Sequence, residues 1–165
     1  MIDRRAALAG GAALTLAGCG SKFRGYDGPE VTRLQVYKAR RRLYLLHHLE
    51  VLDSFPVQLG FRAEGPKRFE GDGRTPEGFY LIDRRNPESD FHLSLGISYP
   101  DAADRAYAAA HGRDPGGDIF IHGDRRPGRD REGPDWTAGC IAVTDRQMER
   151  IYAMVRLGTP IDLFA

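Results

Sequence analysis

Short runs of β-forming residues recur along the chain, and most of them lie between clusters of glycine, proline and aspartate. Runs of this length bounded by turn-forming residues are typical of strands connected by hairpins. The twenty glycines and ten prolines among 165 residues exceed average usage, which favours a β-rich domain over a helix bundle. One run contains Pro56, which predicts an edge or bulged strand at that place. The predicted strands are Val31–Tyr37, Leu43–Leu46, Val51–Leu59, Gly78–Asp83, Phe91–Ser98, Asp118–His122, Gly139–Val143 and Pro160–Phe164.

Two segments have helical patterns, Ala102–Ala110 and Asp145–Leu157. The first is rich in alanine, and the second places its apolar residues on one face. Thr144 and Gln147 are spaced to form a capping box at the start of the second segment, and Gly158 stands just beyond its end. The length suffices for one domain. We therefore expect a mostly β domain, a sheet sandwich or partial barrel, with one or two short helices.

Composition and charge exclude several classes of protein. Apolar residues make up 41% and charged residues 28%, so the chain is neither disordered nor an integral membrane protein. The net charge of +1 provides no basic field for nucleic-acid binding, and the oligomeric state stays open. Four histidines lack metal-ligand spacing with each other and with Cys140, so we expect no metal and no cofactor. These histidines are His47, His48, His92 and His111.

The first nineteen residues resemble the export signal of a bacterial lipoprotein. The basic pair Arg4–Arg5 precedes the uncharged apolar run Ala6–Ala17, which is too short for a bilayer because a span needs about 20 residues. The motif Leu16–Cys19 resembles a lipobox, whose cysteine is lipidated and becomes the first mature residue. We therefore expect residues 1–18 to be a signal peptide of an exported, periplasmic, membrane-anchored protein. The alternatives are an ordinary signal peptide cut near Ala17 and an alanine-rich cytosolic helix. The choice between Sec and twin-arginine export stays open.

Residues 19–30 are expected to be a flexible tether between the lipidated Cys19 and a folded domain at 31–165. The segment Gly20–Glu30 is short, polar and rich in glycine, which suits a linker. Once Cys19 carries lipid, Cys140 is the remaining ordinary thiol. An unpaired cysteine in an exported protein is open to oxidation, so its presence indicates a function.

A histidine and a cysteine adjoin two apolar runs in the second half of the chain. The run Ile119–Ile121 leads into His122, and seventeen residues separate His122 from Cys140, which precedes the run Ile141–Val143. If these runs are neighbouring strands, the imidazole can take the thiol proton and leave a nucleophilic thiolate. Gly139 permits close backbone approach, and the N–H groups around it could hold an oxyanion. Taken singly, a buried structural cysteine and a capping histidine are the alternative interpretations.

The same residues belong to a pattern that resembles the L,D-transpeptidase catalytic domain (YkuD-like) family, and its YafK-like branch in particular. Its centre is His122-Gly123 followed by Thr137–Ile141, which is similar to the family signature of a histidine, a spacer and Ser/Thr-x-Gly-Cys. The resemblance spans roughly residues 31 to 164. Further matches are Gly71–Tyr80, His92–Leu95, Tyr99–Asp101 and Ala142–Asp145.

The resemblance implies a sandwich of mostly mixed sheets and a cysteine-dependent acyl transfer on peptidoglycan stem peptides. Cys140 would attack the meso-diaminopimelate carbonyl at its L centre in a tetrapeptide, releasing the terminal D-alanine. The resulting thioester would pass to an amine acceptor or to water. His122 would serve as base and later as acid, and the Gly123 carbonyl would orient its imidazole. The N–H groups of Gly139 and Cys140 would form the oxyanion hole.

Two positions depart from the family pattern. Ala138 stands where many members have a second histidine, and Ala142 stands where many have arginine or asparagine. The first change removes an auxiliary donor, and the second removes a side chain often placed to meet substrate. The reaction class therefore carries over from the resemblance, but the acceptor and the substrate details do not.

Two other functions remain open from the sequence. One is a hydrolase of the same family that cuts wall crosslinks or wall–protein links, and the other is a non-catalytic, wall-binding lipoprotein. The segment Asp124–Asp135 contains four arginines and four acidic residues, which favours a solvated loop with weak internal ion pairs. Alternatively, its arginines meet stem-peptide carboxylates. Trp136 either walls the site or belongs to the core.

Overall fold

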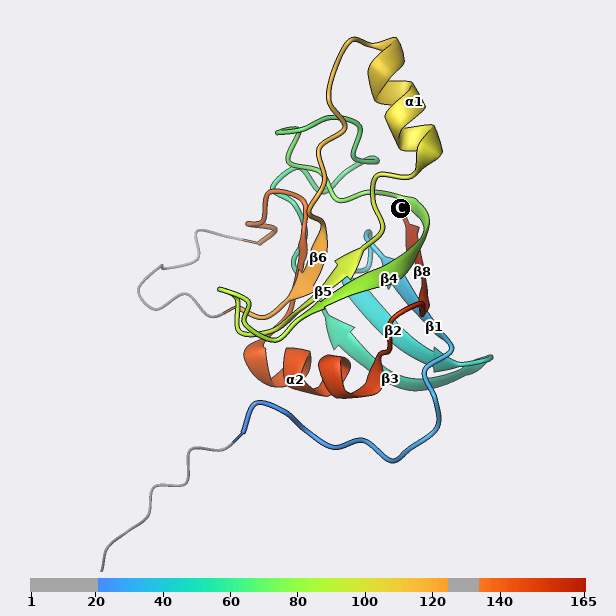
Figure 1. Ribbon diagram of the computed structural model, residues 1–165, viewed down its shortest axis with the longest axis vertical. Coiled ribbons are helices and arrows are strands. Elements are labelled where there is room, and N and C mark those ends of the chain that lie inside the picture. Colours follow the sequence, from blue (N-terminus) through green and yellow to red (C-terminus); the bar gives the residue numbers. More distant parts are fainter. Residues whose placement is uncertain (1–20, 125–133) are drawn as a thin grey trace, which may run out of the picture.

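The computed structural model describes residues 21–124 and 134–165. Within these ranges eight strands form one curled sheet with the order β3-β2-β1-β8-β4-β5-β6-β7, accompanied by two helices (Figure 1). This confirms the predicted mostly β architecture in its partial-barrel form. The elements are β1 (Arg33–Tyr37), β2 (Arg42–His47), β3 (Glu50–Pro56), β4 (Gly78–Asn86), β5 (Ser94–Ile97), α1 (Ala102–Ala110), β6 (Phe120–His122), β7 (Ile141–Ala142), α2 (Asp145–Met154) and β8 (Pro160–Phe164).

The sheet is mixed because two of its strand pairs are parallel. β1 pairs in parallel with β8, and β6 pairs in parallel with β7, whereas the other neighbours are antiparallel. The β1–β8 pair joins the first and last strands in the middle of the sheet. The β6–β7 pair lies at one end of the sheet; it carries His122, and Cys140 immediately precedes β7.

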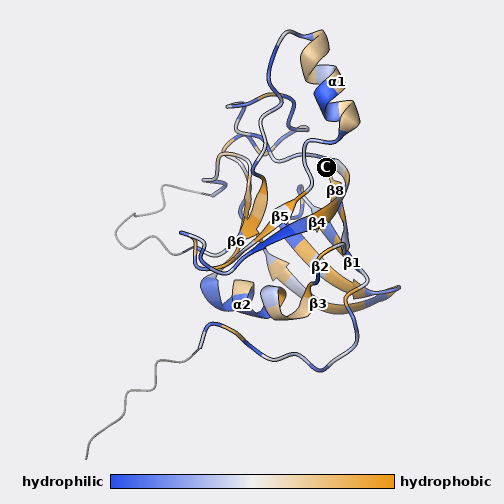
Figure 2. Cartoon of the chain, in the orientation of Figure 1, coloured by the Kyte–Doolittle hydropathy of each residue, from blue (hydrophilic) through white to orange (hydrophobic). Residues whose placement is uncertain are grey.

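The alternation seen in the sequence places one face of each strand against the core. Leu34 and Val36 of β1 and Leu43 and Leu45 of β2 are fully buried, while their neighbours, except Leu46 at the register shift, are partly exposed. A strand turns successive side chains to opposite faces, so this spacing covers one face of the sheet with apolar groups. Figure 2 shows hydrophobic residues concentrated on the strands, and α2 carries both kinds of residue because one of its faces packs on the core.

Five strands are shorter than predicted, and three of these begin shortly after a residue with a positive φ. His92 (φ 75°) precedes β5, Asp118 (φ 53°) precedes β6, and Gly139 (φ 138°) precedes β7. An extended ladder cannot continue through a left-handed residue, so the strand starts beyond it. Pro56 closes the edge strand β3, as predicted, and a register shift lies in its neighbour β2.

The capping box at the start of α2 is confirmed, but its predicted end at Leu157 is wrong. The helix ends at Met154, and Val155 is extended and buried. The guanidinium of Arg85 on β4 donates hydrogen bonds to the carbonyls of Tyr152 and Val155 and so caps the end of α2. A longer helix would lose this cap. A side chain from a distant strand therefore determines where α2 ends.

The first helix, α1, has the predicted bounds and projects away from the sheet (Figure 1). Ala108 is its one buried residue, so most of its alanines face outwards. Neither helix in the described ranges is long and apolar enough to cross a membrane.

The segment expected to be a tether is described from residue 21, and this part runs beside α2 (Figure 1). The Arg24 guanidinium lies 2.6 Å from the Glu149 carboxylate, and the rings of Phe23 and Tyr152 are 6.5 Å apart. Tyr26 packs partly buried against the core. The described part therefore follows the surface of the domain through specific contacts, which its composition did not indicate.

Candidate active site

The parallel pair β6–β7 brings the two reactive side chains to one face of the sheet. Ile121 lies opposite Ile141, and His122 lies opposite Ala142. Cys140 comes two positions before Ala142, and residues two apart along an extended chain point to the same side. The register therefore places His122 on the same face, at the end of the sheet, as Cys140, which immediately precedes β7.

The His122 imidazole is buried, with 3% of the residue exposed. Its Nδ1 lies 2.5 Å from the backbone oxygen of Gly123. A carbonyl only accepts hydrogen bonds, so this contact requires the proton on Nδ1 and leaves the lone pair of the neutral ring on Nε2. The ring can therefore accept a proton at Nε2.

Two aromatic residues surround this imidazole. The ring centroid of Phe91 lies 4.4 Å from that of His122, and the centroid of Trp136 lies 5.9 Å away. Trp136 is half-buried, so it stands beside the histidine at the margin of the core. Its Nε1 is buried without an acceptor among the described residues. The two rings limit how far the imidazole can turn.

The Cys140 thiol is partly buried and donates a hydrogen bond to the Asp118 carbonyl oxygen, at 3.4 Å. Burial raises the pKa of this thiol above its ordinary value, and the charge of Asp118 acts in the same direction. A hydrogen bond from the Phe120 backbone and the positive charge of Lys67 oppose this rise in pKa without cancelling it. The thiol is therefore protonated at neutral pH, and it needs a base before it can act as a nucleophile.

The turn before Cys140 admits only glycine at position 139. Gly139 has a φ of 138°, and a Cβ added there would lie 2.7 Å from the Arg74 carbonyl oxygen. The Gly139 N–H donates to the Thr137 hydroxyl at 3.2 Å, and that hydroxyl donates to the Cys140 carbonyl at 2.7 Å. The N–H that the sequence assigns to an oxyanion hole thus has an internal acceptor in this conformation. It must exchange that acceptor before it can bind an oxyanion.

The model of the L,D-transpeptidase catalytic domain family, YkuD, matches residues 32–163. The chain belongs to this family. It is 31% identical over 128 residues to YafK of Escherichia coli (strain K12), for which L,D-transpeptidase activity is itself a proposal. That alignment covers 74% of this chain and 46% of YafK, so the chain spans about half the length of this relative.

Solved structures of the same architecture include the helical cell shape determining protein Pgp2 from Campylobacter jejuni. Pgp2 is 25% identical with a TM-score of 0.63, and the match covers 88% of this chain and 51% of Pgp2. An L,D-transpeptidase from Mycobacterium smegmatis is 15% identical with a TM-score of 0.54, covering 82% of this chain and 59% of the other. The second likeness concerns the fold alone.

The two departures from the L,D-transpeptidase pattern occupy different environments. Ala138 is exposed beside Gly139, so the position is open to solvent. Ala142 is buried and exchanges backbone hydrogen bonds of 2.8 and 2.9 Å with Gln58, an isolated bridge onto the end of β7. A long polar side chain at position 142 would have to leave this packing to reach solvent.

Several residues named from the sequence lie outside the site or outside the described ranges. Cys19 and residues 125–133 are not among the described residues. The described end of the charged segment is tied to the body, because Arg41 binds the Asp135 carboxylate at 2.6 Å. Within the described ranges no group of three His, Cys, Asp or Glu side chains could hold a metal ion.

Sequence reasoning missed Phe91, Asp118 and Lys67 as neighbours of the site. Phe91 and Asp118 fell inside predicted strands, and positive φ at His92 and Asp118 turns the chain there instead. Lys67 lies in a segment without a strand or helix. Its one sequence signal is its place shortly before the Gly71–Tyr80 motif.

Proposed function

We propose that this chain is a cysteine-dependent peptidoglycan L,D-transpeptidase that acts in the cell wall. It would act on the meso-diaminopimelate carbonyl of stem tetrapeptides through a thioester. The observation that carries the proposal is the β6–β7 register in a member of this family, because it presents Cys140 and His122 on one face. The raised pKa of the thiol and the Nε2 lone pair of the neutral imidazole are complementary properties, since one group must lose a proton and the other can accept it.

In the first half-reaction, Nε2 of His122 takes the thiol proton, and Sγ of Cys140 attacks the carbonyl carbon. The carbonyl oxygen becomes an oxyanion, which would accept hydrogen bonds from the N–H of Cys140 and, once its bond to Thr137 is broken, from that of Gly139. The tetrahedral intermediate collapses, the C–N bond breaks, and the imidazolium gives its proton to the leaving D-alanine amine. The products are free D-alanine and a thioester on Cys140.

In the second half-reaction, His122 takes a proton from the acceptor amine, whose nitrogen attacks the thioester carbonyl. Collapse of this second intermediate breaks the C–S bond, and the proton returns to the sulfur. The imidazole thus acts as base and acid in turn, as is usual for nucleophilic cysteine catalysis. Water in place of the amine would give hydrolysis with the same residues.

Mass spectrometry of the protein after incubation with tetrapeptide muropeptides tests the proposal. We expect a mass increase on Cys140 equal to the muropeptide less D-alanine, and free D-alanine in solution. Cys140→Ser, which keeps the size of the side chain, should show neither while retaining its melting temperature. An unmodified Cys140 in the wild type would favour the non-catalytic, wall-binding alternative.

The muropeptide profile of cells with and without the protein identifies the acceptor. New crosslinks or new protein–wall links in cells that contain the protein indicate transfer to an amine. Loss of existing links indicates hydrolysis and would replace the transferase proposal with the hydrolase.

We also propose that the protein is an exported lipoprotein, with residues 1–18 removed and Cys19 lipidated. The motif Leu16–Cys19 supports this, as does an enzyme whose substrate lies outside the cytoplasm. Cys19→Ala should move the protein from the membrane fraction to the soluble fraction, because it removes the acyl chains that hold it. A wild type that is soluble and keeps its leader would overturn the lipoprotein assignment.

A further inference from the structure

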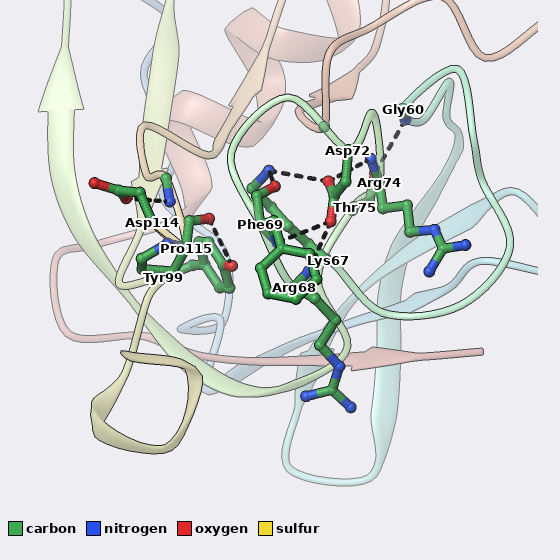
Figure 3. A network of polar contacts seen from close by, with 12 residues as sticks. Gly60, Lys67, Arg68, Phe69, Asp72, Arg74, Thr75, Tyr99, Asp114 and Pro115 are labelled. Carbon is green, nitrogen blue, oxygen red and sulfur yellow. Dashed lines mark hydrogen bonds and ion pairs between the residues drawn. The ribbon is translucent and has the colours of Figure 1, made fainter. Parts of the chain in front are cut away.

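The segment before β4 contains a buried ion pair that the proposed mechanism does not use. Lys67 is 4% exposed, and its Nζ donates to Asp72 Oδ1 at 3.1 Å and to the Phe69 carbonyl at 2.9 Å. The same ammonium lies 6.0 Å from the centroid of the Tyr99 ring. Figure 3 shows this group together with the polar contacts around it. Burying a lysine is costly unless it is paired, so this arrangement calls for a reason.

Asp72 ties the whole of this loop together. Besides Lys67, its carboxylate accepts hydrogen bonds from the backbone N–H groups of Arg68 at 2.7 Å, Phe69 at 3.0 Å and Arg74 at 3.1 Å (Figure 3). Burial acts against its ionisation, but these N–H groups and Lys67 outweigh it, so the pKa of Asp72 lies below its usual value. One ionised carboxylate therefore fixes residues 67–74 in a single conformation.

The loop held by Asp72 rests directly on the turn that carries Cys140. The Arg74 carbonyl oxygen lies so close to Gly139 that a Cβ added there would be only 2.7 Å from it. On the other side, a Cβ at Gly60 would lie 2.2 Å from the Gly73 oxygen and 3.1 Å from the Gly139 Cα. Three backbone segments thus meet without intervening side chains. A shift of the loop would consequently shift the backbone at Gly139 and Cys140.

Lys67 also acts on Cys140 through its charge. Among the described residues, the charged groups that influence the ionisation of this thiol are Asp118, which disfavours the thiolate, and Lys67, which favours it. The thiolate is the form that attacks in the proposed reaction. The ammonium therefore acts in the direction that the chemistry requires.

We propose that Lys67 is a positioning residue for Cys140, whose ammonium, held by Asp72, keeps the 67–74 loop against Gly139 and stabilises the charge of the attacking sulfur. This inference rests on the proposed role of Cys140 as nucleophile. A merely structural ion pair would hold the loop but would leave the reactivity of the thiol unchanged.

The chain offers a matched control in Lys38, a second buried lysine that holds the same stretch of chain. Lys38 is 2% exposed, and its Nζ binds Glu77 at 2.8 Å, the Gly65 carbonyl at 2.6 Å and the Thr75 carbonyl at 3.0 Å. Its charge is not among those that act on Cys140. Replacing either lysine removes a buried ion pair, but only Lys67 should affect the sulfur.

The test is the pH dependence of Cys140 alkylation by iodoacetamide, a small neutral reagent that needs no peptide substrate, with melting temperatures measured in parallel. Lys67→Met should move the midpoint of the alkylation profile to higher pH and slow the reaction at pH 7. Lys38→Met should lower the melting temperature but leave the midpoint at the wild-type value. Lys67→Arg, which keeps a positive charge, should return the midpoint most of the way to the wild-type value.

Lys67→Met leaves Asp72 without its partner, so it can fail to fold. The double variant Lys67→Met/Asp72→Asn removes both charges, keeps an amide oxygen that can accept from the Arg68 and Phe69 N–H groups, and should show the same shift. Equal midpoints in the wild type and in whichever of these variants folds would overturn the inference and leave a structural ion pair. Because alkylation needs no stem peptide, failure of this inference and failure of acyl transfer are separate results.

Discussion

At the scale of single residues, the site combines a thiol that resists ionisation with an imidazole arranged to deprotonate it. Burial raises the pKa of Cys140, and the Gly123 carbonyl holds the His122 proton on Nδ1. In the proposed reaction the pair would therefore transfer its proton when substrate arrives, because the resting sulfur is a thiol. A resting thiol is also less exposed to oxidation than a thiolate would be.

The role of His122 gives the first prediction. His122→Gln keeps a hydrogen-bonding side chain of similar size but cannot carry a proton, so turnover should fall by roughly 10²–10⁴. His111→Gln is the matched control, because the His111 Nδ1 makes a comparable contact, 2.8 Å to the Tyr107 carbonyl, on the exposed helix α1. Turnover of muropeptides and melting temperature are measured for both variants. A His122→Gln enzyme within a few-fold of wild type would assign the base to another residue.

The charge beside the thiol gives the second prediction. Asp118 raises the pKa of Cys140, so Asp118→Asn should lower that pKa and speed alkylation of the thiol at pH 7. Asparagine tolerates the positive φ of Asp118, which preserves the carbonyl that accepts from the thiol. Asp83→Asn is the control, because it also removes one of the two carboxylates that bind Arg84 but leaves the charge of Asp118 in place. Equal alkylation rates for the two variants would show that the charge of Asp118 does not reach the sulfur.

At the scale of elements, the turn between the charged segment and β7 is the most demanding piece of backbone. Gly139 combines a positive φ with a position where an added Cβ would lie 2.7 Å from the Arg74 carbonyl oxygen. Gly139→Ala should therefore destabilise the protein by more than the roughly 1–2 kcal/mol of a left-handed alanine, and it should abolish turnover. Gly158→Ala is the control, because Gly158 has a φ of 81° with nothing within 4 Å of an added Cβ. Thermal unfolding separates the two, and similar losses would show that the contact with Arg74 relaxes easily.

The comparison of sequence and structure is clearest among these elements. β8, α1 and the capping box of α2 were predictable, because alternation, alanine content and cap spacing are local signals. The starts of β5 and β6 were not, since a positive φ at His92 or Asp118 leaves no mark in a single sequence. The end of α2 depends on Arg85, which lies 69 positions before Met154 along the chain.

The same distinction holds for the site. His122 and Cys140 could be chosen from the sequence, because their residue types and motif indicate the chemistry without knowledge of the surroundings. The Lys67–Asp72 pair could not be assigned to the site from the sequence, because its relation to Cys140 depends on three backbone segments meeting at Gly139. Close backbone contacts of this kind arise from the packing of the whole domain.

At the scale of the whole molecule, the described N-terminal segment joins the proposed lipid anchor to α2. Arg24 lies five positions after Cys19, and an extended chain spans at most about 3.5 Å per residue, so the docked Arg24 backbone would lie within roughly 17 Å of the backbone of the lipidated cysteine. With Cys19 in the membrane, as proposed, α2 would face the bilayer. The domain would then work close to the membrane surface for as long as this segment stays docked.

Glu149 is the residue on which this docking depends, because its carboxylate binds both Arg24 and His92. Burial opposes its ionisation, but the hydrogen bonds from Arg24 and His92 outweigh burial and lower the pKa of Glu149. A carboxyl with a lowered pKa stabilises the docked state at every pH above its unfolded value of about 4.3, and the effect is lost as the pH falls through the folded value. Docking should therefore be complete at neutral pH and weaken only in acid.

Glu149→Gln removes this charge and should release the segment at neutral pH. Arg24 is half exposed, so the ion pair contributes only about 1 kcal/mol, and tryptic cleavage after Lys22 and Arg24 should become roughly fivefold faster. Glu30→Gln is the control, because the Glu30–Arg156 pair is exposed on both sides and lies at the other end of the segment. Acid should speed cleavage of the segment in the wild type but not in Glu149→Gln, measured with an acid-stable protease. Unchanged cleavage in Glu149→Gln would mean that the packing of Phe23 and Tyr26 holds the segment without the ion pair.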